Sequence, residues 1–151
     1  MADLSFIYDQ KKRHSDIQIA GGDFVIGDSL QTSVELSLFT DRRATDSEYS
    51  LIAGNTQARK PRRGYWANSF KATKQGSGLW LLQREKRTAE TLSRAKVYAT
   101  SALAWMVKEG IAKSVAAETS FDGTALIVAV SITKPDGTEA GFKYDFAWES
   151  L

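Results

Sequence analysis

The sequence predicts an α+β domain in which an antiparallel β-meander packs against one long helix, with a second helix nearer the N-terminus. Over residues 88–110, apolar side chains recur at spacings of three and four, as on the buried face of a helix. From residue 115 onwards the period changes to two, as in strands. The 151 residues can bury a core without metals or disulfides, so residues 1–151 are expected to form one domain.

Residues 16–26 are predicted to form a β-hairpin. Polar and apolar residues alternate on both sides of Gly21 and Gly22, a pair that suits a tight turn. Ahead of the hairpin, an otherwise polar arm is expected to be held on the body by its apolar residues. These are Leu4, Phe6, Ile7 and Tyr8.

A first helix is predicted over residues 30–39. Asp28 and Gln31 have the spacing of an Asp-x-x-Gln capping box, and the apolar residues that follow fall on one helical stripe. Every second residue from Val34 to Leu38 is also apolar, which leaves a strand as the alternative. The capping signal favours the helix.

Periodicity fails over residues 40–78, where glycine, proline, threonine and paired arginines accumulate. A compact domain rarely leaves more than about 12–15 residues without structure unless the segment is functional or disordered. The segment is more apolar than a linker, with Tyr49, Leu51, Ile52, Tyr65, Trp66 and Phe70. We expect a long loop that docks either on the domain's own core or on another subunit. The arginine pairs favour another subunit, because arginine and aromatic residues anchor protein interfaces.

The long helix over residues 88–110 follows a short apolar helical turn at 78–82. Thr88 suits the N-cap position. Gly110 suits the position just after the helix, where the backbone commonly adopts the left-handed conformation. Polar residues are expected on its outer side. The buried face is predicted to consist of Leu92, Ala95, Tyr98, Ala99, Ala102, Leu103, Trp105 and Met106. The large side chains of this face are interpreted as core residues rather than as a cofactor site.

Three strands are predicted after the long helix. The first alternates over residues 115–121 and ends at the turn Asp122-Gly123. Residues 125–133 are apolar on both faces, as in a central strand, and a second turn follows at 135–137. The last strand places four aromatic side chains on one face, namely Phe142, Tyr144, Phe146 and Trp148.

Several kinds of catalytic and metal site lack the residues they need. The chain has no cysteine, which excludes thiol catalysis and cysteine-ligated metals and fits a reducing compartment. The single histidine, His14, lies in a polar run and is interpreted as a surface residue. Phosphate-binding glycine motifs and the Gly-x-Ser-x-Gly motif are absent, so no cofactor is expected.

No apolar run is long enough to cross a membrane, and no signal peptide is recognisable, so we expect a soluble protein made in the cytoplasm.

The net charge of +2 is distributed unevenly. Residues 59–96 contain eleven lysines and arginines against two glutamates, a local net charge of +9, whereas residues 109–151 have a net charge of −4. This asymmetry indicates a partner surface for an acidic protein or a nucleic acid.

Six short stretches stand out, in this order: Gly22-Asp23, Leu30 to Phe39, Thr40-Asp41-Arg42-Arg43, Arg63-Gly64-Tyr65-Trp66, Gly78 to Leu82 with Arg84-Glu85-Lys86, and Ala104-Trp105. Together they resemble the Mu-like family of phage baseplate proteins. That family is related to the small wedge protein of contractile phage tails, tail-like bacteriocins and type VI secretion baseplates. The wider superfamily often has Glu-Pro-Arg or Gly-Glu-Arg at the position of Asp41-Arg42-Arg43, so the chain departs from the pattern there.

The resemblance implies a structural subunit of the virion tail baseplate, made in the host cytoplasm and without enzymatic activity. It implies that the chain clasps a larger wedge protein and helps to close a hetero-oligomeric ring around the hub and tube. Neither nucleic acid nor a membrane is expected as a partner. The residues expected to bind the partner are Asp41, Arg42, Arg43, Arg62, Arg63, Gly64, Tyr65 and Trp66.

Two other functions remain open from the sequence. Glu35 and Asp41 could serve as acid and nucleophile of a lysozyme-like cell-wall hydrolase, since two carboxylates are what that chemistry needs, although solvated or arginine-paired side chains explain them more simply. The basic region 59–96 could instead bind nucleic acid.

Arg42 and Arg43 are expected to be exposed, so that replacing both would leave the fold almost unchanged.

Overall fold

The computed structural model describes residues 3–4, 6–9, 14–24, 26–27, 29–53, 62–83 and 85–147. Its helical elements are α1 (Ser29–Phe39), α2 (Asp46–Ala53), α3 (Ala89–Lys108) and the 3₁₀ turns η1 (Trp66–Ser69) and η2 (Leu79–Leu82). The strands after α3 are β7 (Ser114–Asp122), β8 (Ala125–Thr133) and β9 (Glu139–Ala147). Those ahead of α1 are β1 (Asp3–Leu4), β2 (Phe6–Asp9), β3 (His14–Ile17), β4 (Ile19–Ala20), β5 (Asp23–Phe24) and β6 (Ile26–Gly27).

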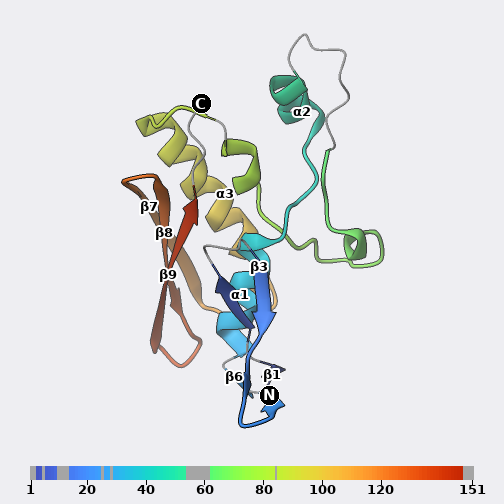
Figure 1. The fold of residues 1–151 in the computed structure, drawn as a ribbon, viewed down its shortest axis with the longest axis vertical. Coiled ribbons are helices and arrows are strands. Elements are labelled where there is room, and N and C mark those ends of the chain that lie inside the picture. The colour runs from blue at the N-terminus through green and yellow to red at the C-terminus, as the bar shows by residue number, and fades with distance from the viewer. Residues whose placement is uncertain are drawn as a thin grey trace.

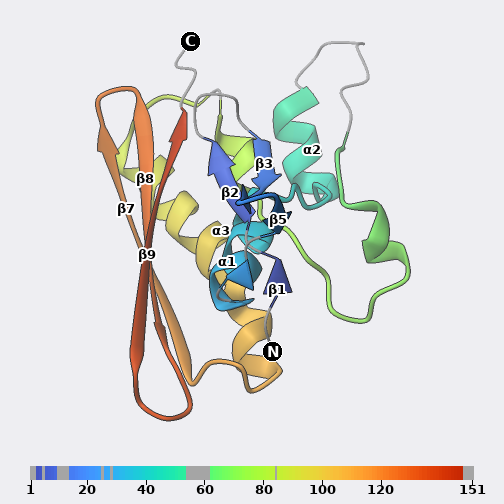
Figure 2. The same cartoon turned by 60° about the horizontal axis from the view of Figure 1, so that its bottom comes forward.

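These elements make the α+β fold that the sequence predicts. A sheet of strands β7, β8 and β9 lies on one side of α3, with α1 beside the helix (Figure 1). Helix α2 and the turn η1 lie on the other side of α3, away from the sheet, in both views (Figures 1 and 2). The molecule therefore has a sheet-and-helix body and a smaller part that projects from it.

The sheet is an antiparallel meander in the order β7-β8-β9, as predicted. Its register places Thr119, Val128 and Tyr144 side by side across the three strands. Alternate residues of each strand face the helices, so apolar side chains line one surface of the sheet. Trp148, which was predicted on the same face, lies outside the described residues.

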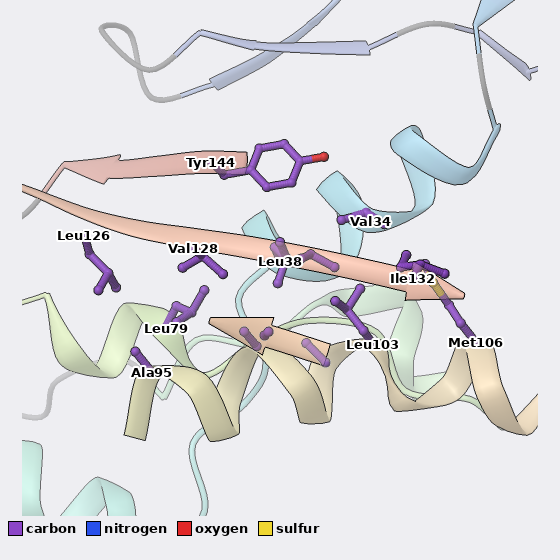
Figure 3. Packing of buried hydrophobic residues seen from close by; sticks show 14 of the residues in the cluster. Val34, Leu38, Leu79, Ala95, Leu103, Met106, Leu126, Val128, Ile132 and Tyr144 are labelled. Atoms are coloured by element: carbon purple, nitrogen blue, oxygen red, sulfur yellow. The ribbon is translucent and has the colours of Figure 1, made fainter. Parts of the chain in front are cut away.

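The core forms between this sheet, α1 and α3. Figure 3 shows Leu103 and Met106 of α3 next to Ile132 of β8, with Val34 and Leu38 of α1 beside them. All five are almost completely buried. The stripe predicted for the long helix thus makes the core, because its spacing of three and four turns one face towards the sheet.

The ends of α3 also agree with the prediction. The Thr88 hydroxyl accepts a hydrogen bond from the backbone N–H of Thr91 at 3.1 Å, and Gly110 has a φ of +74°. The outer face carries mostly polar residues, as predicted, but two valines are exposed there as well. Val97 is 60% exposed and Val107 is 43% exposed on this side of the helix.

The N-terminal segment contains more strand pairing than the sequence indicated. The hairpin turn at Gly21-Gly22 is confirmed, and it joins β4 to β5. The residues predicted as one strand over 16–19 are divided, because β3 pairs with β2 whereas β4 pairs with β5. The arm itself forms β1 and β2, and β1 contacts α1 through a hydrogen bond from the Thr32 hydroxyl to the carbonyl of Leu4 at 3.4 Å.

Helix α1 is confirmed, and the strand alternative for this segment is wrong. Asp28, the predicted capping residue, lies outside the described residues. Its predicted partner Gln31 donates a hydrogen bond from Nε2 to Glu35 Oε1 at 3.0 Å, one turn further along the helix. The apolar stripe that follows packs into the core.

Residues 40–78 are not one continuous loop, contrary to the prediction. Helix α2 begins with a capping box in which the Thr45 hydroxyl accepts from the Glu48 N–H at 3.3 Å and the Glu48 carboxylate accepts from the Thr45 N–H at 2.9 Å. The turn η1 adds further local structure. We call residues 40–53 and 62–78 the arginine lobe, because arginine side chains hold it together.

Candidate partner-binding site

The arginine lobe leaves and rejoins the body through a narrow backbone neck. The N–H of Ser77 donates to the carbonyl of Thr40 at 2.8 Å, and the N–H of Arg42 donates to the carbonyl of Ser77 at 3.0 Å. Gly76 has a φ of +115°, and a Cβ at this position would lie 2.9 Å from the Arg42 nitrogen. Only glycine permits this close approach without strain. The neck therefore fixes where the lobe starts and ends.

Arg42 joins the start of α2 to the body. Its guanidinium makes two hydrogen bonds to the Glu48 carboxylate, at 2.6 and 2.9 Å, and lies 5.2 Å from the ring centre of Tyr98 on α3. The Tyr98 hydroxyl donates to the same carboxylate at 3.1 Å. The hydrogen bonds from Arg42 above all, together with those from the N–H and hydroxyl of Thr45, lower the pKa of Glu48 to about 2. Arg42 is therefore a structural cation and not the exposed side chain that was expected.

Arg62 and Arg63 hold the second segment of the lobe, residues 62–78, in a similar way. Arg62 pairs with Asp46 of α2, and its guanidinium lies 4.4 Å from the ring centre of Tyr49. Arg63 pairs with Asp41 at 2.8 Å and lies over the ring of Trp80, at 4.7 Å. The Trp80 indole in turn donates to the carbonyl of Arg42 at 2.9 Å. Each arginine thus combines an ion pair with an aromatic contact within the chain.

A pocket of about 700 Å³ opens on the surface of this lobe, and we call it the η1 pocket. Its lining residues are Arg42, Arg43, Thr45, Arg63, Gly64, Tyr65, Trp66, Asn68, Ser69 and Lys74. Two large apolar side chains on and after η1 are strongly exposed, with Trp66 at 73% and Phe70 at 84%. Exposed aromatic side chains beside a cationic pocket are typical of protein interfaces.

The loop that carries these aromatic residues is held by its own hydrogen bonds. The Asn68 side chain donates to the carbonyl of Gln75 at 2.7 Å and accepts from the N–H of Gln75 at 2.9 Å. The Thr73 hydroxyl donates to Glu109 at 3.0 Å, which connects the loop to the end of α3. Trp66 and Phe70 are therefore presented from a loop with defined internal contacts.

The structure brings most of the predicted site residues together. Six of the eight line the η1 pocket, namely Arg42, Arg43, Arg63, Gly64, Tyr65 and Trp66. Asp41 and Arg62 do not line it, and their side chains make ion pairs within the lobe. The prediction missed four lining residues, namely Thr45, Asn68, Ser69 and Lys74. Phe70, one of the apolar residues expected to dock, is strongly exposed but does not line the pocket.

The two carboxylates considered for hydrolysis do not share a site. Glu35 is only 4% exposed, within the body, and burial raises the pKa of its carboxyl group. Within the described residues, its Oε2 atom and the buried hydroxyl of Tyr144 have no hydrogen-bond partner. Asp41 is paired with Arg63, and neither carboxylate lines the η1 pocket. The arrangement therefore offers no acid and nucleophile that face a common substrate.

The basic region also contains fewer free cations than its sequence suggests. Arg62 and Arg63 are paired, and Arg94 makes two hydrogen bonds to Glu85, at 2.6 and 2.7 Å.

Two other kinds of site were also considered from the sequence. In the part of the chain that the structure describes, no group of three or more His, Cys, Asp or Glu residues could hold a metal ion. No described helix is both long and apolar enough to span a membrane.

Comparison with known proteins identifies one protein family over most of the chain. Residues 30–139 match the family described as Phage protein GP46. The chain is 40% identical over 153 residues to the "Baseplate protein gp46" of Escherichia phage Mu, with all of both chains covered. It is 32% identical over 140 residues to the "Mu-like prophage FluMu protein gp46" of Haemophilus influenzae, with 91% of each covered.

Proposed function

The chain belongs to the phage protein GP46 family, and we propose that it is a structural subunit of a phage tail baseplate. The name of the Mu relative supports this role, since the similarity extends over the whole of both chains. The proposal places the protein in the tail of the virion. It assigns no enzymatic step, because neither Glu35 nor Asp41 lines the pocket.

Within the baseplate, the protein clasps a larger subunit through the arginine lobe and contributes to a ring around the hub and tube. One observation carries this part of the proposal, the exposure of Trp66 and Phe70 on one loop. Burying an aromatic side chain of this size stabilises a complex by about 1.5–3 kcal/mol. A partner that covers both residues would thus supply the central contact of an interface.

The arginine contacts support the same role, because they explain how a projecting lobe keeps its shape before it meets a partner. Arg42, Arg62 and Arg63 join the two segments of the lobe and its helix to each other. Arg42 and Arg63 also contact the rings of Tyr98 and Trp80 in the body. A surface that already has its bound conformation loses less conformational entropy on binding. These three arginines therefore act by positioning, and the exposed aromatic residues make the contact.

The proposal is tested by expressing the chain with the other tail proteins of its source and purifying the assembled tails. The double variant Trp66→Ala/Phe70→Ala should fold as the wild type by circular dichroism but be missing from the tails. The double variant Val97→Ala/Val107→Ala is the matched control, since it removes two exposed apolar side chains from α3. Incorporation of the first variant at the wild-type level would show that the lobe is not the docking surface.

A further inference from the structure

The η1 pocket has unbalanced charge. Four cationic side chains line it, and two of them are neutralised within the chain, Arg42 by Glu48 and Arg63 by Asp41. The other two are Arg43 and Lys74. Among the described residues, neither forms an ion pair, and Lys74 donates only to the backbone carbonyl of Asn68, at 2.5 Å. No carboxylate is found among the described lining residues. Two positive charges therefore face the pocket without a counter-charge.

The size and the rim of the pocket limit what can enter. A volume of about 700 Å³ holds a few side chains of a partner and not a folded domain. Trp66 lines the pocket, and Phe70 follows directly after η1, so an apolar side chain that enters next to the two cations would contact an aromatic ring. The pocket thus combines two sites for anions with one apolar site.

We infer that the η1 pocket binds an extended acidic segment of another protein, with carboxylates at Arg43 and Lys74 and an apolar side chain against Trp66 and Phe70. The inference rests on the proposed function and adds the chemistry of the partner to it. Carboxylates fit the arginine because its guanidinium can donate two parallel hydrogen bonds to one carboxylate. The acidic segment is a part of the partner subunit that the lobe clasps.

The same two cations could contact the phosphates of a nucleic acid, but the surroundings favour a peptide. Sites for nucleic acids follow the backbone with many cations, and each neutralised phosphate adds to affinity. Here Asp41 and Glu48 stand next to Arg63 and Arg42, so that these arginines add little net positive charge. Two remaining charges suit the few carboxylates of a short segment.

The inference is tested by nuclear magnetic resonance on the full chain, with the indole N–H of Trp66 as the reporter. The probes are a short peptide of glutamate and phenylalanine, its counterpart with glutamine in place of glutamate, and an oligothymidine of equal charge. The glutamate peptide should shift the Trp66 signal saturably, more weakly as salt increases. The glutamine peptide and the oligothymidine should leave it nearly unchanged.

The double variant Arg43→Gln/Lys74→Gln should bind the glutamate peptide about tenfold more weakly, because it loses both ion pairs. Lys113→Gln/Lys143→Gln is the matched control, since it removes two exposed lysines from the region of the sheet. Equal binding of the glutamate and glutamine peptides, tighter binding of the oligothymidine, or unchanged affinity of the first variant would overturn the inference. If the peptides fail but Trp66→Ala/Phe70→Ala is still missing from assembled tails, the proposed function stands and only the acidic partner is wrong.

Discussion

The body and the arginine lobe are held together by different kinds of contact. In the body, apolar side chains of α1, α3 and the sheet exclude water from one continuous core. In the lobe, Arg42, Arg62 and Arg63 pair with carboxylates and lie over aromatic rings. Apolar burial is insensitive to the charge state of the protein, whereas ion pairs depend on pH and salt. The two parts should therefore lose their structure under different conditions.

The two kinds of contact also differ in strength. A buried leucine contributes several times more to the free energy of unfolding than an exposed ion pair does. The lobe is therefore expected to open locally while the body stays folded, as segments with few buried apolar contacts commonly do. Single substitutions in each part can test this difference in strength.

Leu103→Ala should destabilise the whole protein by about 2–5 kcal/mol, because Leu103 is completely buried between α3 and the sheet and its loss leaves a cavity. Urea unfolding followed by circular dichroism measures the change. Val97→Ala, on the exposed side of the same helix, should change stability by no more than about 0.5 kcal/mol. Equal effects of the two substitutions would mean that the face of α3 has been wrongly assigned.

Glu48→Gln should loosen the lobe by about 1–3 kcal/mol without unfolding the body. The substitution weakens the pair with Arg42, which is only partly exposed, and replaces one of the two carboxylate oxygens by an NH2 group, so either Thr45 or Tyr98 loses its acceptor. Hydrogen exchange should become faster in α2 and stay unchanged in α3. Glu118→Gln, at an exposed position of β7, is the control. Faster exchange in α3 to the same degree would show that lobe and body open as one unit.

Acid should act on the two parts in opposite directions. The pKa of Glu48 is lowered from 4.5 to about 2, so its contribution to stability is present above pH 4.5 and is lost as the pH falls towards 2. The pKa of Glu35 is raised from 4.5 by burial, so the body is stabilised when this group takes up a proton. The protection of α2 amides, measured relative to the intrinsic exchange rate at each pH, should therefore be lost on acidification before that of α3 amides.

Glu35→Gln isolates the effect of the buried carboxylate on the body. The glutamine carries no charge, so the urea midpoint of the variant should exceed that of the wild type at neutral pH and approach it on acidification. A midpoint below that of the wild type at all pH values would mean that the carboxylate has a partner that stabilises its ionised form.

Asp46→Asn should have the smallest effect, less than about 1 kcal/mol, because the Asp46 carboxylate is largely exposed where it pairs with Arg62. Limited trypsin digestion at increasing salt measures it. Cleavage after Arg62 and Arg63 should accelerate slightly in the variant, and added salt should reduce the difference from the wild type. A difference that persists at high salt would show that the pair is more than an exposed contact.

The body could be predicted from the sequence because its contacts follow a period. Spacings of three and four predict α1 and α3, spacings of two predict β7 and β9, and a run that is apolar on both faces predicts β8 as the central strand. The short N-terminal strands could not be predicted in full, since two-residue strands contain too few positions to show alternation. Their pairing depends on residues far apart in the chain, such as Leu4 and Ile26.

The lobe could be predicted only in part, for a different physical reason. Its residue types indicated an interface, and Thr45-x-x-Glu48 carried an overlooked capping signal for α2. The partners of its arginines left no periodic trace, because Arg63 and Asp41 are 22 residues apart and Arg62 and Asp46 are 16 apart. Sequence alone therefore could not separate the arginines that hold the lobe from Arg43, which lines the pocket and makes no ion pair with any described residue.

Hydrogen exchange of the isolated chain and of the same chain in assembled tails tests most directly whether the arginine lobe is the docking surface. We expect amides of residues 62–75 to gain protection in the tail, because a partner covers Trp66 and Phe70. Amides of α3 and β8 should keep the protection they already have in the isolated chain. Unchanged exchange over residues 62–75, with new protection on the sheet instead, would contradict the claim and move the interface to the body.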